Sequence, residues 1–247
     1  PAMTEALLAV GGLSRSFGGL KAVQDVSLSV KEGSLSALIG PNGAGKTTPR
    51  ALRWACPKPA AGSVRFAGQD ITGREPHRNA LLGMTRTFQI VKPFAAQTVR
   101  ENIAVGAHLH LRGRREALAH AEAIALRVGL APQLDKPASD LTVAGRKRLE
   151  LARALATRPR LLLLDGVLGG LNPQERGGRM PVVRGIADSG VTVLMIEHVM
   201  QAVMHLAEHV WVLAQGQLIA EGSPAQVTSD DKVVGGYLGH GTAAGLP

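Results

Sequence analysis

The sequence is poor in the residues on which several common classes of protein depend. It has one cysteine, Cys56, which excludes an internal disulfide framework and a metal site built from several cysteines. Its aromatic residues are four Phe, two Trp and one Tyr, which leaves few platforms on which single-stranded nucleic acid could stack. No apolar run approaches the roughly 18 residues of a membrane-spanning helix, so no segment is predicted to cross a bilayer.

What the sequence does contain is typical of a globular chain. It has 247 residues, of which 45% are hydrophobic and 19% are charged, and this length allows for one or two domains. The formal net charge is +9 at pH 7. Because basic proteins attract anions, this charge favours a phosphorylated ligand or a membrane surface as partner.

Apolar residues predict strands near both ends of the chain. Val26, Leu28 and Val30 alternate with polar residues, which indicates a strand with one exposed face. A second strand is predicted at Leu35–Ile39. The later runs Arg160–Leu164 and Val191–Ile196 are nearly all apolar, which indicates strands covered on both faces. The remaining predicted strands are a short one at Val64–Phe66 and a hairpin of Val210–Ala214 with Gln217–Ala220.

The middle of the chain is predicted to be mainly helical. One helix is expected at Arg114–Val128, with Leu118, Ala121, Ala125 and Val128 on its packed face. A second is expected at Arg146–Ala156, with Leu149, Ala152 and Ala156 inward and Arg146, Lys147, Arg148 and Arg153 outward. Ser223-Pro224 is a helix start. The pattern predicts an α/β core interrupted by a helical insert.

A complete phosphate-binding motif follows the strand Leu35–Ile39. Residues 40–47 read Gly-Pro-Asn-Gly-Ala-Gly-Lys-Thr and match G-x-x-x-x-G-K-[ST]. The backbone N–H groups of such a loop surround a β-phosphate, while Lys46 reaches the β- and γ-phosphates and Thr47 ligates Mg²⁺. The alternative is a plain glycine turn, but the preceding strand and the four fixed positions favour a nucleotide site.

Asp165 directly follows the apolar run Leu161–Leu164. Ligands of open α/β sheets bind at the carboxyl ends of the strands, and a carboxylate there can hold Mg²⁺, often through water. The alternative is an ordinary aspartate at a strand end. Beside a phosphate loop, the position favours a metal-holding role.

The chain resembles the ATP-binding subunit of an ABC transporter from Leu7 to Leu238. The resemblance lies in the order of its features: a strand, the phosphate loop, the helical insert, and the leucine run that ends in Asp165. Other segments resemble further motifs of that family: Phe88-Gln89 the Q-loop, Leu141–Gly145 the signature, Gly169–Asn172 the D-loop, Ile196–His198 the H-loop, and Phe17 the aromatic residue that contacts adenine. An ordinary core role remains the alternative for Phe17 and His198, and a turn cap for Gln89.

The resemblance implies a single ABC nucleotide-binding domain over residues 1–247. Its expected fold is α/β: a P-loop NTPase core of mixed sheet and helices with added N-terminal antiparallel strands (1–96 and 157–247), and a helical subdomain with the signature (97–156). ATP and Mg²⁺ are the expected cofactors, held between two such subunits. The residues expected to bind ATP are Phe17, Asn42, Gly43, Ala44, Gly45, Lys46, Thr47, Thr48, Thr142, Ala144 and Gly145. The expected catalytic residues are His198, Gln89 and Asp165, and the expected metal ligands are Thr47, Gln89 and Asp165.

Longer stretches narrow the resemblance to the ATPases of branched-chain amino acid importers; they are residues 17–23, 85–89, 170–173 and 197–200. This implies permease subunits and a second ATP-binding subunit, identical or paralogous, as partners. It also implies a peripheral location on the cytoplasmic face of the plasma membrane, and no direct contact with nucleic acid.

The sequence departs from that family at several positions. Gly166 stands where the family has its catalytic Glu, and a glycine cannot accept a proton. Ala144 and Gly145 replace the usual signature residues. Pro49 and Pro181 fall where helices are expected, and an internal proline disturbs a helix.

These departures leave three functions open. The first is an ATPase that drives an importer. The second is a module that closes on ATP but hardly hydrolyses it, which Gly166 favours. The third is a non-transport ABC protein that acts on nucleic acid, which the charge permits; such proteins usually carry two cassettes or a long coiled coil, and this chain has neither.

Overall fold

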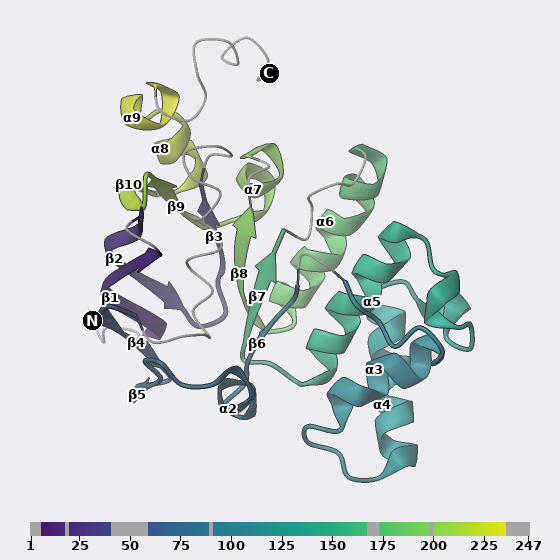
Figure 1. Cartoon of the computed structure of the whole chain (residues 1–247). Coiled ribbons are helices and arrows are strands. Elements are labelled where there is room, and N and C mark those ends of the chain that lie inside the picture. Colours follow the sequence, from purple (N-terminus) through teal and green to yellow (C-terminus); the bar gives the residue numbers. More distant parts are fainter. Residues whose placement is uncertain are drawn as a thin grey trace. The chain divides into compact units, whose positions relative to one another are not determined.

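The computed structural model describes residues 6–17, 20–40, 59–88, 91–166, 173–197 and 200–235. The chain divides into two compact units, one of residues 1–76 with 192–247 and one of residues 77–191. Figure 1 shows the elements of each unit.

The first unit contains an antiparallel sheet in the strand order β2-β1-β4-β5. Its strands are β1 (Ala6–Phe17), β2 (Leu20–Lys31), β4 (Ala61–Phe66) and β5 (Gln69–Asp70). Val26, Leu28 and Val30 are buried, whereas the serines between them are exposed, so the predicted alternation is confirmed. Val64 and Phe66 of β4 are buried as well.

The same unit contains strands with continuous apolar character. Buried β3 (Leu35–Ile39) pairs in parallel with β8 (Thr192–Glu197) and with β9 (His209–Ala214). Strand β10 (Gln217–Gly222) pairs antiparallel with β9 and forms the predicted hairpin. All residues of β3 and β8 are buried, so both faces of these two strands are covered.

Among its described residues, the first unit also contains short helices. They are α7 (Met200–Leu206), α8 (Pro224–Thr228) and α9 (Asp231–Val233). The helix start predicted at Ser223 is confirmed, because the Ser223 side chain accepts a hydrogen bond from the backbone N–H of Gln226 and Gln226 caps it in return.

The second unit combines two parallel strands with a helical region. Strand β6 (Met84–Arg86) pairs with β7 (Leu161–Asp165), and α2 (Pro76–Leu81) leads into β6. The longer helices are α3 (Val99–Ala107), α4 (Arg114–Arg127), α5 (Val143–Ala156) and α6 (Pro173–Asp188), with short 3₁₀ turns at Ala131–Gln133 and Ala138–Asp140.

Helices α3, α4 and α5 pack against one another (Figure 1). The backbones of α3 and α5 approach so closely at Gly106 that a Cβ atom there would collide with the carbonyl oxygen of Arg153. The C-terminal part of α5 therefore lies directly against α3.

Three details of the helices differ from the sequence-based expectation. The packed face of α4 uses Ala117 and Ile124, whereas Leu118 is only half-buried. The Arg153 side chain is 24% exposed, so the prediction that it faces solvent is wrong. Helix α6 continues through Pro181, which lies on its exposed side, so one backbone hydrogen bond is lost without ending the helix.

In the part of the chain that the structure describes, no helix is both long and apolar enough to cross a membrane.

Candidate nucleotide-binding site

Strand β3 leads directly into the phosphate-binding motif. Gly40 is buried next to β9, where a Cβ atom would lie 3.2 Å from the backbone oxygen of Leu213. The strand that the motif requires before it is therefore present. Residues 41–50 lie outside the described residues, and with them Asn42, Gly43, Ala44, Gly45, Lys46, Thr47, Thr48 and Pro49.

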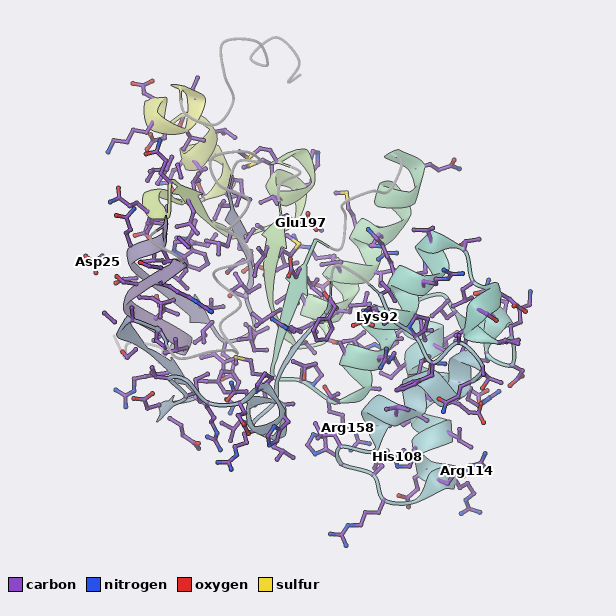
Figure 2. The ribbon with its side chains drawn as sticks, in the orientation of Figure 1. Asp25, Lys92, His108, Arg114, Arg158 and Glu197 are labelled. Carbon is purple, nitrogen blue, oxygen red and sulfur yellow. The ribbon has the colours of Figure 1, made fainter. Side chains whose placement is uncertain are left out.

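Strand β8 ends level with β3. In the parallel pairing Ile39 lies opposite Glu197, so the two strands end at the same level of the sheet. The Glu197 side chain is 3% exposed at the end of β8 (Figure 2). His198 lies outside the described residues. The register places the carboxyl ends of β3 and β8, which precede the phosphate loop and His198 in the sequence, at the same edge of the sheet.

Strand β7 delivers Asp165 at its carboxyl end. Leu161–Leu164 are buried, whereas Asp165 is only partly buried. The backbone N–H of Asp165 donates a hydrogen bond to Thr87 Oγ1 (3.1 Å), and the Thr87 N–H donates to the carbonyl of Leu163 (2.9 Å). Thr87 therefore fixes the end of β7 and, two residues before Gln89, ties the β6 strand end to Asp165.

Gly166 adopts a left-handed backbone conformation, with φ of +61°. Residues with a side chain adopt this conformation rarely. Gly166 is also buried. The position after Asp165 thus lacks a side chain and has a backbone that suits glycine.

The signature segment forms the first turn of α5. Thr142 is the N-cap residue, and its Oγ1 accepts a hydrogen bond from the N–H of Gly145 (3.1 Å). Leu141 is buried, whereas Val143 is 65% exposed. A helix N-terminus carries partial positive charge and attracts phosphate groups. Thr142, Ala144 and Gly145 therefore lie on a turn that can face an anion.

A buried arginine contacts this turn from α6. Arg179 is 3% exposed, and its Nη2 donates to the carbonyl oxygen of Ala144 (3.1 Å). Sequence reasoning missed this contact, since the spacing of residues in α6 gave no sign that a cation there would be buried.

A second group missed from the sequence lies further along α5. Glu150 is 8% exposed, and its Oε2 lies 3.4 Å from Arg153 Nη1. Burial raises the pKa of the Glu150 carboxyl, while Arg153 and a hydrogen bond from the backbone N–H of Phe88 oppose that rise. Arg153 Nη1 also donates to the carbonyl oxygen of Lys92 (3.2 Å), a residue labelled in Figure 2.

The remaining predicted residues are only partly described. Phe17 is the last residue of β1, and its side chain lies outside the described residues. Gln89 and the segment Gly169–Asn172 also lie outside them.

Asp165 has the chemistry that a magnesium ligand requires. An accessible carboxylate at a strand end is the oxygen ligand that Mg²⁺ prefers, and Asp165 supplies one. Within the described ranges no group of three or more His, Cys, Asp or Glu side chains could hold a metal by itself. Mg²⁺ that is bound with a nucleotide needs only one or two protein carboxylates beside the phosphate oxygens, and Asp165 fits that requirement.

Curated relatives match nearly the whole chain. BraF of Pseudomonas aeruginosa, a high-affinity branched-chain amino acid transport ATP-binding protein, is 38% identical over 96% of this chain and 99% of its own. LivG of Escherichia coli K12, which carries the same description, is 36% identical over 96% of this chain and 99% of its own.

Solved structures match the fold. The ADP conformation of MJ1267, an ATP-binding cassette of an ABC transporter, superposes with a TM-score of 0.84 at 31% identity, over 96% of this chain and 100% of its own. The family model described as ABC transporter matches residues 23–168. With a family match over more than half its length and relatives above 30% identity, this chain belongs to the ABC transporter family.

Proposed function

We propose that this chain is the ATP-binding subunit of an importer of branched-chain amino acids, in which ATP binding and hydrolysis drive transport. The observation that carries the proposal is the identity of 36–38% to subunits described in this way, over 96% of the chain. The strand ends at Gly40 and Asp165 support it, because they bring a phosphate loop and a carboxylate to carboxyl ends of parallel strands.

Each predicted site residue would have its own role in binding and hydrolysing Mg-ATP. The backbone of residues 42–48 and Lys46 would hold the phosphates, and Phe17 would stack on adenine. Thr47 and Asp165 would hold Mg²⁺, directly or through water, with Gln89 as a third ligand or sensor. When bound, Mg²⁺ supplies positive charge that stabilises the transferred phosphoryl group. His198 and Gln89 would orient the attacking water.

The signature turn would serve a second subunit. Thr142, Ala144 and Gly145 would face the nucleotide held by the phosphate loop of a partner ATP-binding subunit, identical or paralogous. The helical subdomain, residues 97–156, would receive a permease subunit at the cytoplasmic face of the membrane. Crosslinks from the permease to residues 97–139 and to residues just after Gln89 would support this docking, whereas crosslinks confined to residues 227–238 would contradict it.

One observation favours a second candidate, an ATP-gated module that hydrolyses slowly. Gly166 offers no carboxylate, and its φ of +61° suits a glycine. A general base is worth about 10²–10⁴-fold in rate. This candidate predicts ATP binding and subunit closure with phosphate release slower by about that factor.

Reconstitution tests the proposal. Proteoliposomes that contain the cognate permeases, this chain and its partner ATPase should take up leucine, isoleucine or valine only when ATP is supplied on the side of the ATPases. The Lys46→Ala variant should lose this uptake, because it removes the cation that reaches the phosphates. Uptake that is equal with both proteins, or absent for all three amino acids with the wild type, would contradict the proposal.

A further inference from the structure

The turn between α3 and α4 carries positive charge and no acidic residue. Residues 108–115 read His-Leu-His-Leu-Arg-Gly-Arg-Arg, and the chain from Asn102 to Arg115 contains neither Asp nor Glu. The polar side chains of this turn are all exposed; they are His108, His110, Arg112, Arg114 and Arg115. The turn therefore gathers exposed charge of one sign, in a place that the nucleotide site does not use.

The arginines of the turn lack the carboxylate partners that would neutralise them. Among the described residues, neither Arg112 nor Arg115 forms an ion pair or a side-chain hydrogen bond. Arg114 Nη2 lies 3.9 Å from Glu101 Oε1, but the two side chains are 79% and 42% exposed, so this pair is weak. Arg100 of α3, by contrast, contacts two carboxylates. The cations of the turn can therefore meet an external anion without breaking strong internal contacts.

The backbone of the turn is fixed. The N–H groups of residues 109–111 donate to the last carbonyls of α3, and His108 Nδ1 lies 2.9 Å from the carbonyl oxygen of Leu111. At the start of α4, Glu116 folds back over Gly113, where a Cβ atom would lie 3.4 Å from its Oε2. A fixed turn presents its charges without the ordering cost that a flexible segment meets on binding.

Arg158 adds a further exposed cation from α5. Helices α3 and α5 lie against each other near their carboxyl ends, because a Cβ atom on Gly106 would be 3.2 Å from the Ala156 Cβ. Two residues beyond these positions, His108 and Arg158 leave their helices at the same end of the helical region, where Figure 2 also labels Arg114. The Arg158 side chain is exposed. Residues 108–115 together with Arg158 are called the basic end below.

The residues between the cations favour a lipid surface over other anionic partners. Leu109 and Leu111 alternate with the histidines and are partly exposed, and apolar side chains of this kind can enter the boundary between headgroups and acyl chains. Aromatic residues, on which unpaired bases stack, are absent from residues 95–120. A second copy of this chain is a poor partner, since it also carries a net charge of +9.

We propose that the basic end binds the anionic headgroups of a phospholipid bilayer, as a contact with the membrane that is separate from the permease. The choice of a membrane rests on the proposed function, since a transporter subunit works beside a bilayer, whereas the charge and exposure of the basic end do not depend on it. Clusters of basic residues beside a bilayer bind anionic headgroups.

The basic end does not overlap the segment that follows Gln89. Residues 91–98 lead into the opposite end of α3, which has 9 residues. At about 1.5 Å per residue, the helix separates its two ends by about 13 Å. A permease that docks just after Gln89 and a lipid surface at the basic end would therefore contact different parts of the helical region.

Sedimentation with sucrose-loaded vesicles measures binding of the full-length chain in the absence of permease. One set of vesicles is pure phosphatidylcholine, and the other contains one part of phosphatidylglycerol to two parts of phosphatidylcholine. Saturating Mg-ADP keeps the phosphate loop from taking up headgroups. The wild type should bind the anionic vesicles at low salt and not the neutral ones. High salt should release it, because salt screens the attraction between exposed charges.

Two triple variants lose the same charge from different places. The first removes the arginines of the turn: Arg112→Gln, Arg114→Gln and Arg115→Gln. The second is the matched control and removes exposed cations of β2, β4 and α2: Lys31→Gln, Arg65→Gln and Arg78→Gln. A third variant changes the arginines of the turn to lysine and so keeps their charge.

The expected changes follow from charge. One basic residue beside an anionic surface changes binding about fivefold, so the first variant should bind anionic vesicles at least about tenfold more weakly and the control less than about threefold more weakly. The lysine variant should bind like the wild type, since a surface of headgroups responds to charge. All substituted side chains are exposed, so urea midpoints should stay close to that of the wild type.

Several results would overturn the proposal. Equal weakening in the first variant and the control would show that net charge alone causes the binding. Wild type that binds neutral and anionic vesicles equally, or neither, would exclude recognition of headgroup charge. A gel shift with duplex DNA at the same salt tests the competing partner: binding tighter than to the vesicles, and lost only in the first variant, would assign the basic end to nucleic acid.

This test fails or succeeds separately from the proposed function. A chain that binds anionic vesicles through the basic end but supports no ATP-driven uptake would refute the proposed function alone. A chain that drives uptake of leucine, but whose vesicle binding is unaffected by the first variant, would refute the role of the basic end alone.

Discussion

The hydroxyl of Thr87 accepts a hydrogen bond from the backbone N–H of Asp165, at 3.1 Å, across the ends of two neighbouring parallel strands. Thr87 is 2% exposed, and its own N–H donates to the carbonyl of Leu163. One buried threonine therefore fixes the backbone from which the Asp165 carboxylate projects, and it stands two residues before Gln89.

Replacing Thr87 by Val should destabilise the end of β7. The substitution keeps the shape but leaves the Asp165 N–H without its acceptor, and an unsatisfied buried donor costs about 1–3 kcal/mol. Urea unfolding measures this loss. Thr87→Ser, which retains the hydroxyl, should lose less; a Ser variant as unstable as the Val variant would show that the methyl group, and not the hydrogen bond, matters at this position.

Two buried asparagines should respond in opposite ways to the same substitution. Asn79 is 1% exposed, and among the described residues neither atom of its amide has a hydrogen-bond partner. Asn79→Leu should therefore stabilise the chain by about 1–3 kcal/mol, because it removes a buried polar group that has no partner.

Asn102 supplies the contrast. It is fully buried, and its Nδ2 donates to the carbonyls of Phe94, Gln97 and Thr98. Asn102→Leu should destabilise the chain by at least about 2 kcal/mol, because it leaves backbone groups unsatisfied. Chemical denaturation of both variants checks the signs. Destabilisation by Asn79→Leu would mean that this amide is satisfied in solution.

The stability of the helical region should fall in mild acid because of His120. Burial and then the nearby Arg158 lower the pKa of this histidine below its ordinary value of 6.5; Arg127 lowers it further, and a hydrogen bond with the Ala156 backbone opposes the shift. The folded state thus binds the proton less readily than the unfolded state. The stabilisation is complete above the ordinary value and is lost as the pH falls below it.

Comparison of two proteins isolates this effect. Urea midpoints between pH 8 and pH 5 should fall more steeply for the wild type than for His120→Phe, which cannot titrate at this position. Parallel profiles for the two proteins would assign the acid sensitivity to other groups.

Gly166→Glu tests whether the missing carboxylate limits hydrolysis. The left-handed backbone at this position opposes the substitution. The new carboxylate should raise phosphate release at least about tenfold if it reaches the attacking water. A residue with a side chain pays on the order of 1–2 kcal/mol to keep the left-handed backbone at φ of +61°. Gly166→Ala measures that cost without a carboxylate. Brisk wild-type hydrolysis that Glu197→Gln abolishes would instead identify buried Glu197 as the base.

The sequence contained enough information for the strand ends but too little for the contacts between helices. Leu35–Ile39 and Leu161–Leu164 are short apolar runs, and burial on both faces makes such runs strands almost regardless of their surroundings. The residue after such a run can then indicate the chemistry of the site, as the carboxylate of Asp165 does. Glu150 and Arg153 gave no such signal, because their partners, Phe88 and Lys92, lie about 60 residues earlier in the chain.

The helical spacing of apolar residues also does not determine whether a polar residue at the edge of the packed face is exposed or contacts another segment. Arg153 was expected to face solvent and nothing in the sequence singled out Arg179, but each donates to a backbone carbonyl of another segment. Long side chains can cover apolar surface and still reach a distant acceptor, and spacing alone cannot tell this from exposure. The continuity of α6 through Pro181 likewise depends on that residue lying on the exposed side.

Equilibrium binding of Mg-ATP tests the central claim most directly. A fluorescent ATP analogue is titrated into the wild type and into Lys46→Ala, with and without Mg²⁺. The account predicts saturable binding by the wild type that strengthens with Mg²⁺, and affinity weakened at least about tenfold in Lys46→Ala, because charge-assisted contacts to phosphate are lost. Equal binding by the two proteins, or no binding by the wild type, would contradict it.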